Sequence, residues 1–262
     1  MTTPSKVQIH EIDADNAGQR LDNYLIKTLK GLPKSRIYRI IRKGEVRINS
    51  KRCKPEVKLV AGDLVRIPPI QHLPARSTAV GHFNDVESLM VYEDDHLLII
   101  NKPAGMAVHG GSGVSVGVIE SLRHARPEGN RLELVHRLDR GTSGCLMVSK
   151  RRSYLKLLQD ALRKPGQIRK HYLAVVHGRW ARKMIQIDQP LLTSSIAGKE
   201  RVTRVNGQGK YAVTDFSLLE ANDEMSIVRA SPRTGRTHQI RVHARWARHP
   251  LVGDTRYGDQ TL

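Results

Sequence analysis

The chain has 262 residues, 39% of them hydrophobic, which is long enough for about two domains. Its two cysteines, Cys53 and Cys145, argue against a disulfide framework or a thiolate zinc site, and no apolar run suits a signal peptide or a membrane span. Lys and Arg number 44 against 25 Asp and Glu, a formal net charge of +19. The few cysteines lead us to expect a cytoplasmic protein. The positive charge indicates that it binds nucleic acid, although a solvated basic surface would have the same composition.

Residues 18–70 have the pattern of one compact module. Leu21, Leu25 and Leu29 recur every four residues before Gly31, which predicts an amphipathic helix. A second helix is predicted to open at residues 33–35 and to end at Gly44, with Ile37, Ile40 and Ile41 on its core face. Alternating residues around Val46 and Ile48, and again around Val65 and Ile67, predict strands. Two helices should therefore pack on a small sheet.

This module carries much of the charge. It contains 14 Lys and Arg against 4 Asp and Glu, an excess of 10. Arg36, Arg39 and Lys43 follow one another at spacings of three and four, so they share one face of the second helix. A single basic face is what the phosphate backbone of RNA would contact.

The rest of the chain has a different pattern. Residues 71–85 lack periodicity and read as a linker. Residues 86–262 read as a second domain of the α+β class, built on a largely antiparallel sheet of short strands, with helices at 152–164 and 237–247. Thr237 is a candidate N-cap for the last helix, whose Ile240, Ala244 and Ala247 share one face.

One turn in this domain is a candidate functional site. In LELVHRLDRGTSGCLMVSK, residues 132–150, Asp139 lies between Arg137 and Arg140 in a polar turn flanked by two apolar runs. A carboxylate held there by strands can reach a ligand, and nearby arginines would favour its ionised form. The alternative is that Asp139 only accepts backbone N–H groups in the turn, and on spacing alone the two stay open.

Longer stretches show a resemblance. HRLDRGTSG is similar to the signature of the RluA family of pseudouridine synthases, and EDDHLLIINKPAGMAVHGG, RKHYLAVVHG and SPRTGRTHQIRVHARWARHPLVGDTRYG match further elements in the right order. RLDNYL, LPKSRIYRIIRKGEVRIN and AGDLVRIP resemble the alpha-L RNA-binding module. The resemblance runs from about residue 15 to the C-terminus. It implies a pseudouridine synthase fold preceded by an alpha-L domain.

The resemblance also implies roles for individual residues. The signature aspartate, Asp139, would be the catalytic residue that drives cleavage of the uridine glycosidic bond, and Arg137 would fill the gap left by the flipped base. Tyr172 would lie over the uracil and take part in proton transfer, although its alternating strand also suits a core residue. Arg241 would pair with the catalytic aspartate.

Other basic residues are implied to bind RNA: Arg140, Lys170, Arg233 and Arg236, with Arg36, Arg39 and Lys43 of the N-terminal module. His238 and His243 are expected to have core or capping roles. Such chemistry requires no metal, redox cofactor or ATP. The implied partner is large-subunit ribosomal RNA or the assembling large subunit, and nothing in the sequence demands more than a monomer.

Other functions fit less well. HRLDRGTSG lacks the later motifs of a kinase, GGSGVSVG lacks the Gly-Lys-Ser/Thr of a P-loop, no zinc deaminase signature occurs, and no methyltransferase glycine turn is convincing. The alternative from another class is a non-catalytic RNA-binding or ribosome-assembly factor that keeps the fold. Relatives usually continue beyond GDTRYG, whereas this chain stops at Leu262, so the resemblance implies a C-terminally incomplete catalytic domain.

Overall fold

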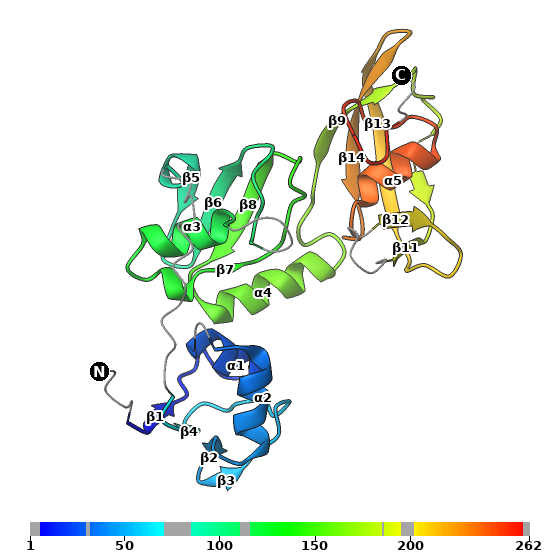
Figure 1. Ribbon diagram of the computed structural model, residues 1–262. Helices are drawn as coiled ribbons and strands as arrows, with labels where there is room; N and C mark the ends of the chain where they lie inside the picture. Colours follow the sequence, from blue (N-terminus) through cyan, green and yellow to red (C-terminus); the bar gives the residue numbers. More distant parts are fainter. Residues whose placement is uncertain are drawn as a thin grey trace. The chain divides into compact units, whose positions relative to one another are not determined.

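The computed structural model describes residues 6–29, 32–70, 85–110, 116–184, 186–194 and 202–258 (Figure 1). The chain forms two compact units, an N-terminal unit of Met1–Gln159 and a C-terminal unit of Asp160–Leu262. Among the described residues, none of the helices is long and apolar enough to cross a membrane.

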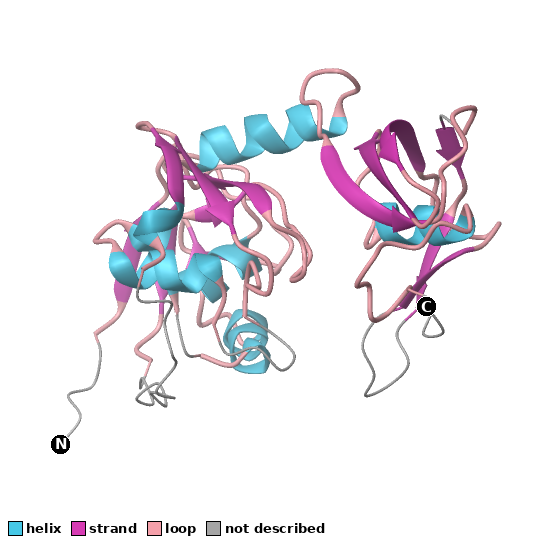
Figure 2. Ribbon diagram, turned by 90° about the horizontal axis from the view of Figure 1, so that it is seen from above, coloured by secondary structure: helices cyan, strands magenta, loops and turns pink. Residues whose placement is uncertain are grey.

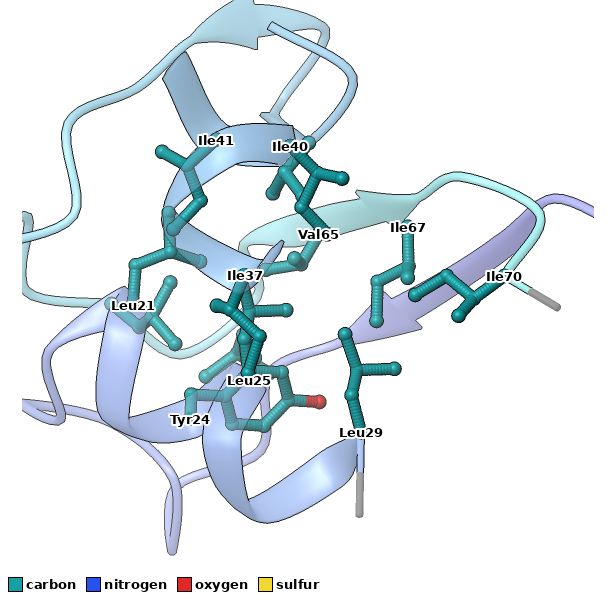
Figure 3. Packing of buried hydrophobic residues seen from close by; sticks show 13 residues of the cluster. Leu21, Tyr24, Leu25, Leu29, Ile37, Ile40, Ile41, Val65, Ile67 and Ile70 are labelled. Atoms are coloured by element: carbon teal, nitrogen blue, oxygen red, sulfur yellow. The ribbon is translucent and has the colours of Figure 1, made fainter. Parts of the chain in front are cut away.

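The first part of the N-terminal unit contains the two predicted helices, α1 (Leu21–Thr28) and α2 (Lys34–Arg42). The leucines of α1 and the isoleucines of α2 point into one cluster, as Figure 3 shows for Leu21, Leu25 and Ile37, which have no exposed surface. The chain then turns at Gly44, whose φ of 71° is a left-handed conformation that glycine adopts easily. The predicted helix periodicity is therefore confirmed.

A small antiparallel sheet completes this module, in the strand order β1-β4-β2-β3. Its strands are β1 (Gln8–Glu11), β2 (Arg47–Ile48), β3 (Lys51–Arg52) and β4 (Leu64–Ile67). Val65 and Ile67 of β4 are buried against the helices, which confirms the predicted packing of two helices on a sheet. β1 was not predicted, and it pairs with β4 from residues that precede the range expected for the module.

The second part of the N-terminal unit is built on an antiparallel sheet in the order β5-β6-β8-β7. Its elements are η1 (Glu87–Leu89), β5 (Met90–Glu93), β6 (Leu97–Lys102), α3 (Val118–Ala125), η2 (Gly129–Arg131), β7 (Glu133–Leu134) and β8 (Gly144–Ser149). Leu98 and Ile100 of β6 and Leu146 and Val148 of β8 are fully buried. These two buried, paired strands therefore support the loops that follow them.

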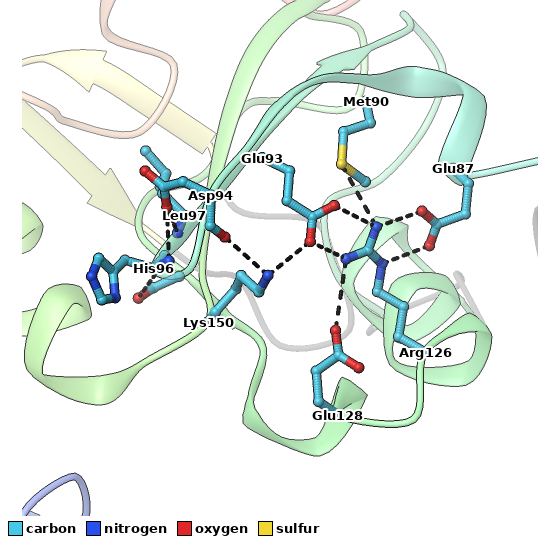
Figure 4. A network of polar contacts seen from close by, with 10 residues as sticks. Glu87, Met90, Glu93, Asp94, His96, Leu97, Arg126, Glu128 and Lys150 are labelled. Carbon is cyan, nitrogen blue, oxygen red and sulfur yellow. Dashed lines mark hydrogen bonds and ion pairs between the residues drawn. The ribbon is translucent and has the colours of Figure 1, made fainter.

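An ion-pair network ties β5 to the chain beyond α3 (Figure 4). The Arg126 guanidinium donates to both carboxylate oxygens of Glu87, at 2.7 and 2.6 Å, and to Glu93 at 2.6 Å. Lys150 donates to the same Glu93 carboxylate at 2.8 Å. These two donors, Arg126 first and Lys150 second, lower the pKa of Glu93 to about 2. The network thus holds a carboxylate ionised well below neutral pH.

The helix α4 (Arg152–Arg163) confirms the prediction for residues 152–164, and the division between the units falls within it. The C-terminal unit contains β9 (Tyr172–His177), β10 (Gln186–Asp188), β11 (Leu191–Ser194), β12 (Val202–Val205), β13 (Val213–Ala221), β14 (Met225–Pro232) and α5 (Gln239–Trp246). Four strands form an antiparallel sheet in the order β10-β13-β14-β9, and β11 pairs with β12.

The helix α5 lies against this sheet, as Figure 2 shows. Ile240, Ala244 and Ala247 pack with Phe216 and Val228 in one apolar cluster, which confirms the predicted core face of the helix. The fold is therefore of the α+β class with antiparallel sheets, as predicted. The predicted linker at 71–85 falls almost entirely outside the described residues, so the domain ranges 18–70 and 86–262 stay a prediction.

Candidate active site

Asp139 lies in the loop that joins β7 to β8. Leu134 of β7 pairs with Val148 of β8, and buried Leu138 anchors the loop beside them. The Asp139 carbonyl accepts the Thr142 N–H at 3.0 Å, which closes a tight turn. Asp139 is half-buried, whereas Arg137 and Arg140 on either side are exposed. A carboxylate is thus presented from two paired strands.

A buried lysine lies directly beneath this loop. Lys102, the last residue of β6, pairs in register with Gly144 at the start of β8 and has no exposed surface. Its Nζ donates to the carbonyl oxygens of Pro103 and Met106, both at 2.8 Å, and of Arg140 at 3.3 Å. The ammonium group therefore joins the loop after β6 to the Asp139 loop.

Two further hydrogen bonds connect the same loops. Gly105 N–H donates to the Arg140 carbonyl at 2.8 Å, and the Arg140 guanidinium donates from Nε to the Gly105 carbonyl at 2.9 Å. Burial lowers the pKa of Lys102, and the negative charge of Asp139 opposes that shift. Lys102 and Asp139 are thus electrostatically coupled. No role was predicted for Lys102, although the apolar run LLII shortly before it indicates burial.

In the C-terminal unit, Tyr172 opens β9 opposite Ala230 of β14 and is partly buried against the apolar cluster there. Lys170 precedes it, and burial lowers the pKa of this lysine. Its Nζ lies beside Gly235, 3.8 Å from where a Cβ would stand. Lys170 and Tyr172, both in the RKHYLAVVHG stretch, thus lie just before and at the start of β9, and Lys170 lies next to Gly235.

Arg241 on α5 forms a two-pronged ion pair with Asp254. Its Nε and Nη2 donate to the two carboxylate oxygens at 2.7 and 2.8 Å, and its guanidinium lies 4.9 Å from the centre of the Tyr257 ring. Burial opposes ionisation of Asp254, but hydrogen bonds from Arg241 and from the N–H groups of Tyr257 and Arg256 outweigh it and lower the pKa. Asp254, in the GDTRYG stretch, was not predicted as a site residue.

The helix α5 does not begin as expected. The prediction that Thr237 caps it is wrong, because His238 is the N-cap residue, with a left-handed φ of 53° and no capping side-chain hydrogen bond. The Gln239 side chain instead accepts the Arg236 N–H and the Thr234 hydroxyl, so the turn is stabilised from within the helix. His243 is buried and bonded to Thr214, as expected of a core residue.

The remaining predicted basic residues lie at the surface. Arg233 forms an ion pair with Asp215 at 2.7 Å, and Arg236 donates from Nε to the Tyr211 carbonyl at 2.9 Å. On α2 of the N-terminal unit, Arg39 and Lys43 are exposed and Arg36 is half-buried, opposite the isoleucine face. The structure thus brings Lys170, Arg233 and Arg236 together in the C-terminal unit. The expected pairing of Arg241 with Asp139 of the other unit stays a prediction.

The fold and these motifs define a class of RNA-modifying isomerase. A family model described as RNA pseudouridylate synthase matches residues 96–246, and an S4 domain matches residues 19–65. The chain therefore belongs to the pseudouridine synthases, as its resemblance to the RluA family predicts, and it carries an S4 domain where the alpha-L module was expected.

Individual relatives are more specific. The chain is 54% identical to ribosomal large subunit pseudouridine synthase C of Escherichia coli strain K12, over 98% of this chain and 82% of that protein. It is 51% identical to the protein of the same name from Pasteurella multocida, over 97% and 79%. Among solved structures, it is similar to human RNA pseudouridylate synthase domain containing 1, with a TM-score of 0.54 and 29% identity, covering 66% of this chain and 70% of that one.

Proposed function

We propose that this enzyme isomerises specific uridines of large-subunit ribosomal RNA to pseudouridine, with Asp139 as its catalytic carboxylate. The substrate assignment is supported by the 54% identity, along nearly the whole chain, to enzymes named for the ribosomal large subunit. The position of Asp139 in a turn held by β6, β7 and β8 supports its role, because a reacting group must be held in place before the substrate arrives.

The proposed reaction exchanges one bond for another. The bond between N1 of the uracil and C1′ of the ribose breaks with the help of the Asp139 carboxylate, and the base turns. A bond then forms from C5 to the same C1′, the proton leaves C5, and N1 ends protonated. Tyr172 lies over the uracil in this proposal and takes part in the proton transfer.

The uridine must leave the RNA stack before it can react, at a cost of roughly a few kcal/mol. Arg137 is exposed on the same loop as Asp139, and we assign it to the gap left by the flipped base. Arg241 is the proposed partner of the ionised aspartate, and its ion pair with Asp254 supports a fixed position for its guanidinium.

The RNA is held by basic surfaces in both units. The exposed face of α2 contributes Arg36, Arg39 and Lys43, and the positions near the site contribute Arg140, Lys170, Arg233 and Arg236. Each neutralised phosphate adds affinity through counterion release. The partner is ribosomal RNA or an assembling subunit; a monomeric state and a cytoplasmic location stay predictions.

The test compares the native protein with Asp139→Asn, which keeps the size of the side chain and removes its charge. Both are incubated with protein-free large-subunit RNA, and pseudouridine is mapped by a chemical label specific for it. We expect product from the native protein alone, at discrete uridines, with both proteins melting at similar temperatures. Equal product from both would exclude the catalytic role of Asp139, whereas no product from either would favour a non-catalytic RNA-binding or assembly factor.

A further inference from the structure

Tyr211, just before β13, is an exposed aromatic residue on a rigid support. Its side chain and backbone together are 61% exposed, whereas the next two residues, Ala212 and Val213, are 0% and 1% exposed. Within the part of the chain that the structure describes, its hydroxyl group makes no hydrogen bond. Burial of its neighbours fixes the backbone, so the ring is held at the surface without an internal partner.

Two arginines lie on the segment that is hydrogen-bonded to the chain at Tyr211 and Val213. Arg236 donates from Nε to the Tyr211 carbonyl at 2.9 Å, and its terminal nitrogens have no partner among the described residues. Arg233 is held by Asp215 at 2.7 and 3.0 Å. Hydrogen bonding to Asp215 raises the pKa of Arg233. The Arg233 N–H donates to the Val213 carbonyl at 2.9 Å, which joins this segment to the start of β13.

The two segments that carry these residues are joined by one buried side chain. Gln239 is 4% exposed, and its Oε1 accepts the Arg236 N–H at 3.0 Å and the Thr234 hydroxyl at 2.7 Å. Its Nε2 donates to the Val213 carbonyl at 2.9 Å. The backbone that carries the tyrosine and the arginines is therefore fixed before any ligand binds, which reduces the entropy lost on binding.

We propose that Tyr211 is a stacking site for an unpaired base of the RNA, with Arg236 and Arg233 facing the adjoining phosphates. This inference rests on the proposed function for its ligand class. The site is distinct from the flipped uridine, which we assign to Tyr172. Aromatic faces accept any base, and guanidinium groups beside them meet the backbone, so the site selects unpaired strands rather than a particular sequence.

The test measures binding of the full chain to a labelled single-stranded RNA oligonucleotide of mixed sequence, by fluorescence anisotropy over a series of salt concentrations. Tyr211→Ala should weaken binding by about 5- to 150-fold, the range that follows from losing one stacked base, and by a similar factor at every salt concentration. Tyr211→Phe keeps the ring and should bind within about twofold of native. Arg236→Ala should instead reduce the slope of log affinity against log salt concentration by about one, because one phosphate contact is lost.

Tyr92→Ala is the matched control, because Tyr92 is also an exposed tyrosine, at 49%, and lies in the other unit. It should bind like the native protein, and all variants should melt near the native temperature. Native-like binding by Tyr211→Ala would overturn the inference, and so would equal weakening by Tyr211→Phe, since the hydroxyl rather than the ring would then be responsible. Because the readout is binding, a protein that binds through Tyr211 yet forms no pseudouridine would refute only the proposed function.

Discussion

Replacing Lys102 by methionine tests whether a buried ammonium group positions the Asp139 loop. Methionine has a similar length and flexibility, so it fills the space of the lysine while it removes the charge and the three hydrogen bonds. The Arg140 carbonyl would keep the Gly105 N–H as a donor. The carbonyls of Pro103 and Met106 would lose the only donor that reaches them among the described residues.

The expected cost follows from these contacts. Hydrogen bonds from a charged donor contribute roughly 1.5–3 kcal/mol each, and the variant loses them. The variant also no longer buries an ammonium group, which offsets part of this loss. We therefore expect a net loss of about 2–4 kcal/mol in the free energy of unfolding. The rate should fall further than stability explains, because displacement of a reacting group by about 1 Å costs on the order of 100-fold.

Urea unfolding gives the free energy, and single-turnover release of tritium from RNA labelled at uracil C5 gives the rate, at a temperature where the variant is fully folded. Lys156→Met removes an exposed lysine and should change stability by less than about 0.5 kcal/mol. A folded Lys102→Met enzyme with the native rate would refute the positioning role.

Two further changes test other ion pairs. Asp254→Asn should cost about 2–4 kcal/mol in the free energy of unfolding, because a half-buried Arg241 loses its carboxylate partner. It should also lower kcat at least tenfold with little change in KM. A native kcat would show that this ion pair does not position Arg241. The Glu93 pKa is about 2, below its unfolded value, so its stabilisation is present above about pH 4.5 and is lost as the pH falls toward 2. Glu93→Gln should cost about 1 kcal/mol at neutral pH, after solvent screening, and flatten this acid loss in urea titrations; an equally steep loss would exclude Glu93 as a source.

The helices could be predicted because each satisfies local rules that agree with its packing. Leu21 and Leu25 of α1 follow the helix period and are buried on one face. β1 could not be predicted in this way. Its one aliphatic residue, Ile9, is 66% exposed, so the strand is held mainly by backbone pairing with β4, which leaves no apolar alternation in the sequence.

Lys102 and Asp254, which were not predicted as site residues, both depart from the usual behaviour of their residue type. Lysine is almost always at the surface, so a lysine at the end of an apolar strand reads as the point where the strand emerges. Lys102 is instead fully buried and bonds to three carbonyls. Asp254 lies in a turn, where aspartate commonly accepts backbone N–H groups. It accepts those of Arg256 and Tyr257, but it binds Arg241 as well, and only the folded chain reveals that second role.

Of the two arginines next to Asp139 in sequence, Arg140 supports the loop that carries the carboxylate. Arg140 uses its guanidinium and its carbonyl to join the loop to Gly105 and Lys102, so it serves the backbone around the carboxylate. In the other unit, the Asp254 carboxylate holds the Arg241 guanidinium in an ion pair. In both cases a charged group is fixed by a buried or half-buried partner before RNA binds. Since charges held in advance need no reorganisation during reaction, these partners should affect the rate of the chemical step more than the affinity for RNA.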